Sequence, residues 1–238
     1  MDDIEYLKDQ QRVTFARVGV GDPLHLETYQ QLGGFEGLRN ALAMTNQDIV
    51  DQIKDSGLRG RGGAAFPAGI KMQTVLDTDA DQKYIACNAD EGDSGTFADR
   101  LLMEADPYQL IEGMIIAGRA VGATRGYIYL RSEYPTALRI LNTAIERATD
   151  EGFLGDSILG SSSDFRIEVR LGAGAYICGE ETAMLDSIEG KRGMVRAKPP
   201  LPAISGLFGK PTVVNNVLTL AAMTTILEKS ATAYQQLG

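Results

Sequence analysis

The chain has 238 residues, of which 44% are hydrophobic and 23% are charged, with a formal net charge of −9 and a pI of about 4.7. This composition is ordinary for a globular protein, and the length suffices for one large domain or two small ones. The acidic balance argues against nucleic acids and anionic membrane surfaces as partners. It leaves room for an anionic small ligand, which needs only local positive groups and helix N-termini.

Cysteine and histidine are too sparse for several kinds of site. Cys87 and Cys178 form no C-x-x-C pair and no cluster with histidine, so we predict no metal or iron–sulfur site within this chain. Two isolated thiols favour a reducing, cytoplasmic setting. His25 is the sole histidine, which gives little support to Ser-His or Cys-His catalysis. The apolar stretch 111–121 is too short to cross a bilayer, so we expect no direct membrane insertion.

The N-terminal part of the chain predicts helices. The first 25 residues are polar, and we expect little regular structure there. Helical spacing over 28–44 is interrupted at Gly33 and Gly34. Thr45 and Asp48 have the spacing of a capping box, and an apolar face follows them, so a helix is predicted from there to Gly57.

A glycine-rich loop follows over 57–67, with glycines at 57, 60, 62 and 63. Such glycines let the backbone approach a ligand closely, while Arg59 and Arg61 offer cationic groups suited to phosphate. Lys71 follows in a short helix predicted near 69–76. We favour a ligand-binding loop over a solvated turn between two helices. The loop does not follow a predicted strand, so it lacks the context of a Rossmann fingerprint.

The next segment places carboxylates at the end of a strand. Residues 83–87 are typical of a buried strand, and the polar loop 88–96 contains Asn88, Asp90, Glu91 and Asp93. Ligands of α/β sheets bind at the carboxyl ends of strands, where amides and carboxylates can bind sugar hydroxyls or the N–H edge of a heterocycle. A plain polar turn explains this segment equally well.

The central part of the chain alternates helices and strands. Asp106 and Pro107 are expected to begin a helix that runs to about 121, with Asp106 as its N-cap. A strand over 126–131, a helix over 134–149 and a strand over 165–170 follow.

The last strand leads into a second glycine-rich loop, 171–181, and a helix from about Glu180 to 188. Backbone N–H groups at such a helix start can bind an anionic ligand, although ordinary helix-start chemistry explains one of the two carboxylates Glu180 and Glu181. Carboxylates here disfavour a ribose 2′-phosphate, so NAD is predicted over NADP.

The C-terminal part holds a basic, proline-rich loop over 191–202. Its four cations suit either a pyrophosphate clamp or a solvated or subunit-facing loop. A helix is predicted over 215–228, with Asn215 and Asn216 at its start either as caps or as ligand contacts. The alternation of strands and helices predicts an α/β fold: a single sandwich-like domain with a mainly parallel sheet flanked by helices. It is Rossmann-like without the usual G-x-G-x-x-G fingerprint.

Taken together, these segments resemble the FMN- and NADH-binding flavoprotein subunit shared by complex I, NAD-reducing hydrogenases and NAD-dependent formate dehydrogenases. The matching stretches are 56–64, 87–91, 172–182, 198–200, 209–212 and 214–217, within a resemblance that covers about 30–238. Stretches 92–100 and 192–198 look most like the beta (diaphorase) subunit of molybdenum-containing formate dehydrogenases. The chain departs from common family residues at Thr74, Asp93, Ser94, Leu201 and Leu218.

The resemblance implies FMN as cofactor and NAD(H) as substrate, with hydride transfer between them and no side chain acting as acid or base. It implies FMN contacts from Gly60, Arg61, Gly62, Lys71, Asn88, Asp90, Tyr176, Gly179, Glu180, Val214, Asn215 and Asn216. It implies NAD(H) contacts and substrate positioning from Phe66, Asp93, Glu181 and Lys198. The implied partners are an iron–sulfur subunit with a 2Fe–2S cluster and a molybdopterin subunit that acts on formate.

The resemblance also implies a domain organisation. Residues 1–30 are expected to form an N-terminal extension, and 31–238 the FMN- and NADH-binding domain. Because family members continue with a β-rich domain and a domain that holds a 4Fe–4S cluster, we expect the chain to be a fragment that lacks both. The alternatives are a complex I or hydrogenase flavoprotein subunit and a flavin-free scaffold. A kinase or ATPase is disfavoured because G-x-x-x-x-G-K-S/T is absent.

Overall fold

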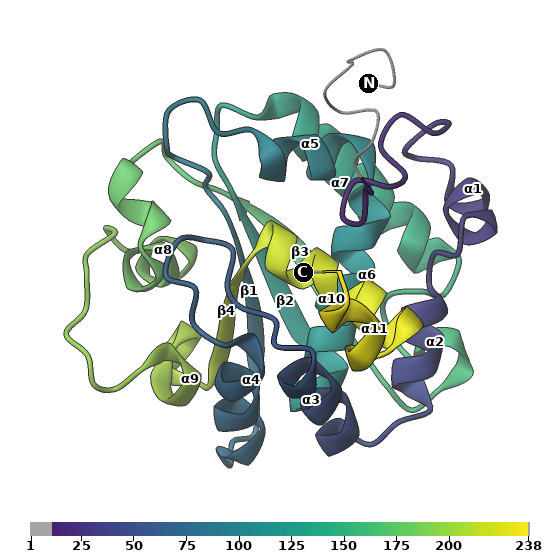
Figure 1. Ribbon diagram of the computed structural model, residues 1–238. Helices are drawn as coiled ribbons and strands as arrows, with labels where there is room; N and C mark the ends of the chain where they lie inside the picture. Colours follow the sequence, from purple (N-terminus) through teal and green to yellow (C-terminus); the bar gives the residue numbers. More distant parts are fainter. Residues whose placement is uncertain (1–10, 238) are drawn as a thin grey trace.

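The computed structural model describes residues 11–237, so the first ten residues of the expected N-terminal extension lie outside it. A sheet of four parallel strands in the order β3-β2-β1-β4 forms its centre (Figure 1). The strands are β1 (Tyr84–Ala89), β2 (Arg125–Leu130), β3 (Arg166–Leu171) and β4 (Thr212–Asn216). Helices cover both faces, which confirms the predicted α/β fold with a parallel sheet.

The order of the strands creates a crevice at one edge of the sheet. Strands β1, β2 and β3 are neighbours in that order, and β4 then pairs with the other edge of β1, the edge away from β2. Cys87 of β1 is therefore opposite Ile128 on one side and Asn215 on the other. Because the strand order reverses between β1 and β4, the segments that follow these two strands separate, and ligands of open α/β sheets bind at such a point.

The two faces of the sheet are covered unequally. On the thick face, Ile85, Ile128 and Val213 join the large core with α6 (Pro107–Val121) and α10 (Val217–Lys229). Around these helices pack α2 (Glu36–Leu42), α3 (Asn46–Asp55) and α7 (Pro135–Asp150). On the thin face, Ala86, Tyr127 and Val214 pack in a smaller cluster with α8 (Glu181–Ile188). Figure 1 shows α8 and α9 (Pro202–Ser205) on the side of the sheet away from α6 and α10.

Close contact between α6 and α10 depends on one glycine. A Cβ atom added at Gly113 would lie 2.1 Å from the carbonyl oxygen of Leu220, so no larger residue fits there. Nearly every residue of both helices is buried, as expected for helices that are apolar around most of their circumference. The central helices of the thick face are thus fixed against each other and provide a rigid base for β4 and β1.

Several predicted features of the N-terminal half are confirmed. Gly33 and Gly34 separate α1 (Leu26–Gln31) from α2, and a capping box begins α3. Thr45 Oγ1 accepts from the Asp48 N–H at 3.2 Å, while Asp48 accepts from the Thr45 N–H at 3.3 Å. The glycine-rich loop leads into α4 (Ala68–Asp77), close to the predicted helix at 69–76.

One predicted helix start was wrong, one helix was not predicted, and one predicted cap differs in its side-chain contact. Residues 212–216 form strand β4, and the helix predicted from Asn215 begins at Val217, because the register with β1 extends the strand to Asn216. Helix α5 (Ala98–Ala105) was not predicted. Asp106 is at the N-cap position of α6 as predicted, but its side chain does not cap the helix; this buried carboxylate instead accepts from Arg17 Nε at 2.9 Å.

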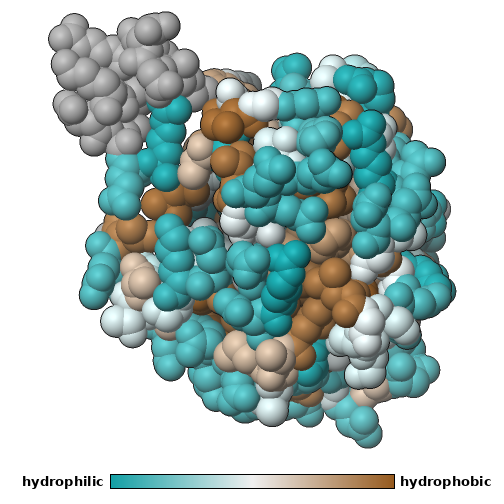
Figure 2. Space-filling model, turned by 90° about the vertical axis from the view of Figure 1, so that its right-hand side faces the viewer, coloured by the Kyte–Doolittle hydropathy of each residue, from teal (hydrophilic) through white to brown (hydrophobic). Residues whose placement is uncertain are grey.

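The chain ends in α11 (Ala231–Gln235), which packs on α3 and α10. The face that carries α1 and α2 in Figure 1 is mostly hydrophilic, with smaller apolar patches (Figure 2). Within residues 11–237, no helix is both long and apolar enough to cross a membrane.

Candidate functional site

A cavity of about 930 Å³ opens at the carboxyl edge of β1 and β4. Both glycine-rich loops line it, together with the loop after β1, Lys71 of α4 and part of the basic loop. Its volume is in the range of cofactor-binding sites. Every predicted site residue except Asp90 lines it, namely Gly60, Arg61, Gly62, Phe66, Lys71, Asn88, Asp93, Tyr176, Gly179, Glu180, Glu181, Lys198, Val214, Asn215 and Asn216.

The first glycine-rich loop is closed by its own backbone. The Gly60 N–H donates to the Phe66 carbonyl at 2.9 Å, and the Arg61 N–H donates to Thr219 Oγ1 at 2.9 Å. A Cβ at Gly62 would lie 3.3 Å from Asn216 Cβ, so glycine allows the loop to approach the end of β4. The Arg61 guanidinium donates to Tyr234 at 2.7 Å and is engaged with α11. The loop therefore offers the cavity mainly backbone groups, whereas the sequence also suggested guanidinium contacts to phosphate.

Lys71 and Asn215 provide hydrogen-bond donors beside the end of β4. Lys71 Nζ donates to the Val214 carbonyl at 2.5 Å and lies 3.4 Å from Asn215 Oδ1. Burial lowers the pKa of Lys71, with a smaller opposing effect of Glu181. Asn215 Nδ2 is buried and has no hydrogen-bond partner among the described residues. Since buried donors are almost always paired, this one fits an acceptor-rich ligand such as the flavin ring.

Asn88 connects the end of β1 to the second glycine-rich loop. Its Nδ2 donates to the Gly179 carbonyl at 2.8 Å, and its Oδ1 accepts from the Asp90 N–H at 3.2 Å. Asp90 is buried behind this contact, 3.4 Å from where a Gly179 Cβ would stand. Burial raises the pKa of Asp90, and the charge of Arg131 opposes this. Asp90 thus lies against the cavity wall, and the FMN contact that the resemblance implies for it stays a prediction.

Glu180 and Glu181 begin α8 and share a cation. Glu180 is the N-cap: its Oε2 accepts from the N–H groups of Thr182 at 2.8 Å and Ala183 at 2.9 Å. Lys198 Nζ donates to Glu180 at 3.0 Å and to Glu181 at 2.6 Å. Burial raises the pKa of Glu180, but these hydrogen bonds outweigh it and the pKa is lowered. Helix-start chemistry therefore accounts for Glu180, whereas in the described part of the chain the Glu181 carboxylate is held only by the Lys198 side chain.

Two exposed aromatic side chains, Phe66 and Tyr176, line the cavity. The Tyr176 hydroxyl donates to Asp93 Oδ1 at 2.7 Å, although Tyr176 is 71% exposed. Phe66, Phe97 and Leu201 are also exposed, and Phe66 and Leu201 line the cavity. The Tyr176–Asp93 hydrogen bond joins the loop after β1 to the second glycine-rich loop across the mouth.

Two further carboxylates line the cavity: Glu91, which the sequence placed in the polar loop after β1 without assigning it a contact, and Asp99, which it missed. Glu91 caps α5, accepting from the N–H groups of Asp99 at 2.9 Å and Arg100 at 3.0 Å, and from the Tyr134 hydroxyl at 3.0 Å. Asp99 accepts from Asn216 Nδ2 at 2.6 Å. Burial and the Glu91 charge raise the pKa of Asp99 to about 7. Asp99 could not be identified from the sequence, because helix α5, which positions it, was not predicted.

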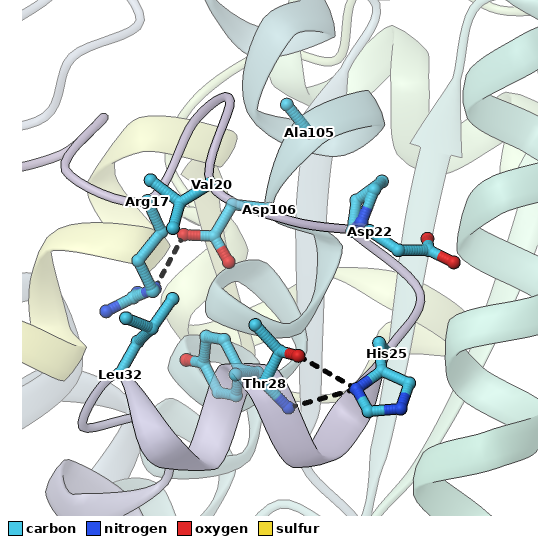
Figure 3. Close-up of a pocket in the computed structure, with 10 residues that line it drawn as sticks. Arg17, Val20, Asp22, His25, Thr28, Leu32, Ala105 and Asp106 are labelled. Carbon is cyan, nitrogen blue, oxygen red and sulfur yellow. Dashed lines mark hydrogen bonds and ion pairs between the residues drawn. The ribbon is translucent and has the colours of Figure 1, made fainter.

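A second cavity, of about 20 Å³, lies beside α1 and contains the sole histidine (Figure 3). His25 Nδ1 is 2.8 Å from Thr28 Oγ1 and accepts from the Thr28 N–H at 3.3 Å, so His25 caps α1. Arg17 and Asp106 form an ion pair on the other side of this cavity. The volume suits a single water molecule, which leaves the large cavity as the candidate site.

Comparison with known proteins places this site in a family. Residues 53–225 match the Nuo51 FMN-binding domain, most of the chain. The chain belongs to this family. It is 50% identical over 231 residues to the NADP-reducing hydrogenase subunit HndC of Solidesulfovibrio fructosivorans, covering 97% of this chain and 47% of that protein. It is 49% identical to one subunit of the NADH-quinone oxidoreductase of Escherichia coli, covering 91% of this chain and 49% of the relative.

A solved structure shows the same fold. The crystal structure of an NAD+-reducing NiFe hydrogenase in its H2-reduced state superposes with a TM-score of 0.77 at 36% identity, over 94% of this chain and 36% of the other. The chain spans about half the length of the curated relatives it matches. The resemblance to the flavoprotein family is thereby confirmed, and the matched FMN-binding domain confirms the predicted cofactor.

Proposed function

We propose that the large cavity binds FMN and, beside it, NAD(H), and that the domain catalyses hydride exchange between them. The observation that carries this proposal is the cavity itself: two glycine-rich loops, the unpaired amide donor of Asn215, the Lys71 ammonium and a lysine-paired glutamate meet at the point where the strand order reverses. When bound, FMN supplies a two-electron acceptor for hydride that can also exchange electrons singly with iron–sulfur clusters.

The protein's own groups bind and orient. Lys71 and Asn215 supply N–H donors for acceptor atoms of the flavin, while the glycines at 60 and 62 let the backbone come close to its phosphate-bearing side chain. Glu181 and Asp93 lie at the more open end, where carboxylates can accept from ribose hydroxyls. Thr74 and Leu201 line the cavity at positions where family members often have aromatic residues, so we expect weaker stacking of the adenine here.

A binding experiment with matched lysine variants tests the proposal. Lys71→Met should weaken FMN binding at least about tenfold, or about 1.4 kcal/mol, because a charge-assisted hydrogen bond is lost. Lys83→Met is the control, since Lys83 Nζ also donates to a carbonyl, that of Leu76 at 2.8 Å, but lies outside the cavity. Affinity is measured by quenching of FMN fluorescence on titration with protein.

The same sample distinguishes the flavin-free scaffold from the oxidoreductase. A yellow purified protein that reduces ferricyanide with NADH supports the oxidoreductase. A folded protein that binds no FMN would instead favour the scaffold, and equal FMN affinity in the two lysine variants would contradict the assignment of Lys71.

For the whole protein, we propose the diaphorase subunit of an NAD-dependent formate dehydrogenase, supported by the stretches 92–100 and 192–198. Its partners would be a 2Fe–2S subunit and a molybdopterin subunit, and a 4Fe–4S cluster would lie in a region beyond residue 238. We also propose 31–238 as the FMN- and NADH-binding domain, 1–30 as its extension, and a cytoplasmic location, supported by the free thiols of Cys87 and Cys178.

A hydrogenase flavoprotein subunit is the second candidate, because HndC matches 97% of the chain. Isolation of the native complex separates the two. Formate-dependent NAD reduction with molybdenum in the complex supports the first candidate, and hydrogen-dependent reduction with nickel supports the second.

A further inference from the structure

Asp99 connects the two sides of the crevice in the cavity wall. It is 5% exposed, yet it lines the cavity. It is the second residue of α5, whose first turn is held by the Glu91 carboxylate. Through its 2.6 Å hydrogen bond from Asn216 Nδ2, it joins this helix to the end of β4. Asn216 is in turn fixed by its Oδ1, which accepts from the Leu218 N–H at 2.9 Å and caps α10.

A carboxylate at this position costs stability. Burial and the charge of Glu91 both raise the pKa of Asp99, and the hydrogen bond from Asn216 only partly opposes them. An asparagine would accept the same hydrogen bond without a buried charge, so packing alone does not require an acid. Ionisable groups that are unfavourable for the fold and line a cavity are typical of functional sites.

Within residues 11–237, the groups around Asp99 leave its charge without a cation. On β1, the Cys87 thiol lies nearby, and burial together with the Asp99 charge raises the pKa of that thiol. The charged side chains of α7, and those at the far end of α10, are exposed. The other charged groups of the surrounding elements have partners elsewhere: Arg100 with Glu104, Arg131 with Glu133, and Glu112 with Tyr29.

We propose that Asp99 is a positioning residue that also exchanges a proton: it orients the Asn216 carboxamide beside the bound cofactor and changes its own charge when the charge of the site changes. This inference rests on the proposed function of the cavity. A hydride brings two electrons and one proton, so its arrival adds one negative charge to the site. Once the oxidised nicotinamide has dissociated, the Asp99 carboxylate takes one proton from the solvent to become the acid. When the two electrons leave for the acceptor, this proton and the proton that the hydride carried both return to the solvent.

The first test needs no cofactor. The pKa of Asp99 in the fold is about 7, above its ordinary 3.8, so the folded state disfavours the charged form. Stability from this group is therefore lost as pH rises from about 4 to about 7. Asp99→Asn should raise the Tm at about pH 8 and leave it unchanged or lower at about pH 5. The control Glu104→Gln, on the same helix but outside the cavity, should show no such dependence on pH.

The second test measures the midpoint potential of the FMN-loaded protein at about pH 6 and about pH 8. A negative charge at Asp99 opposes reduction, so Asp99→Asn should raise the potential at the higher pH and change it much less at the lower pH. If Asp99→Asn shifts the midpoint potential equally at both pH values, or does not shift it, the proposed role of Asp99 is overturned. Failure of the wild-type protein to bind FMN would instead count against the proposed function.

A measurement on the wild-type protein decides the case if Asp99→Asn does not fold. The carboxyl carbon NMR signal of Asp99 should titrate near pH 7 in the FMN-loaded protein and should move to a higher pKa when the flavin is reduced. A pKa near the ordinary value of 3.8, or a pKa that does not change when the flavin is reduced, would overturn the inference.

Discussion

Two pairs of carboxylates line the same cavity at helix N-termini, and the two pairs differ in their hydrogen-bond and ion-pair partners. Glu180 and Glu181 at the start of α8 share the ammonium of Lys198. Glu91 and Asp99 at the start of α5 have backbone N–H groups, a tyrosine and an amide as partners, but no ion pair among the described residues. Both helix N-termini favour anions, so the two pairs of carboxylates differ in whether a lysine pairs with them and in how deeply they are buried.

We call Glu180 and Glu181 the α8 wall and Glu91 and Asp99 the α5 wall; the contrast between them indicates that they have different functions. The α8 wall is partly exposed, and one ammonium partly neutralises its two carboxylates, so a nucleotide can exchange partners there at little cost. The α5 wall is more buried and keeps an uncompensated carboxyl, which suits a resident group whose charge changes. The sequence alone predicted acidic residues at the start of α8 and at the end of β1, but it did not single out Asp99, and only the partners in the fold separate the two pairs.

The largest expected effect is on the α5 wall. Glu91→Ala removes three hydrogen bonds that hold α5, at a residue whose φ of +37° already requires support. We expect a loss of about 2–4 kcal/mol in the free energy of unfolding, from the lost cap and the unpaired donors. Urea denaturation measures it. Glu133→Ala, an exposed carboxylate paired with Arg131, should change little; equal stability of Glu91→Ala and the wild-type protein would remove the distinction between the walls.

A smaller effect is expected on the α8 wall. Lys198→Met leaves Glu180 and Glu181 unneutralised, and we expect the KM for NADH to rise about tenfold with little change in kcat, because nucleotide binding and not the chemical step is affected. Lys191→Met is the matched control in the same loop, since Lys191 pairs with Glu189 and lies outside the cavity. A fall in kcat at constant KM would place Lys198 in the chemical step instead.

The same contrast explains how much of the site was predictable. The α8 wall follows from local signals: an alternating strand, a glycine-rich loop and acidic residues at a helix start are all contiguous, and Glu180 caps the helix as such patterns predict. The parallel sheet also follows from the alternation of strands and helices. These features depend on residues close together in the chain.

The α5 wall depends on contacts between distant segments. Asp99 and Asn216 are 117 residues apart, and neither α5 nor β4 has a strong local pattern. Residues 212–216 form strand β4 because they pair with β1. The sequence predicted a helix start at Asn215 and Asn216, and Asn216 does cap the helix that follows the strand. The direction of the Arg61 side chain toward Tyr234 could not be predicted for the same reason, since the two residues are 173 positions apart.

The smallest expected effect is at the mouth, where the two walls meet. Tyr176→Phe removes the hydroxyl that donates to Asp93, keeps the ring, and should leave FMN affinity unchanged. Because NADH must compete with this exposed hydroxyl for Asp93, we expect the KM for NADH to fall about twofold. Asp93→Asn alone should raise this KM, and in the double variant the gain from Tyr176→Phe should disappear, because the two residues are coupled. Additive effects in this cycle would mean that Tyr176 and Asp93 act on the nucleotide independently, and that the hydrogen bond between the two loops has no part in its binding.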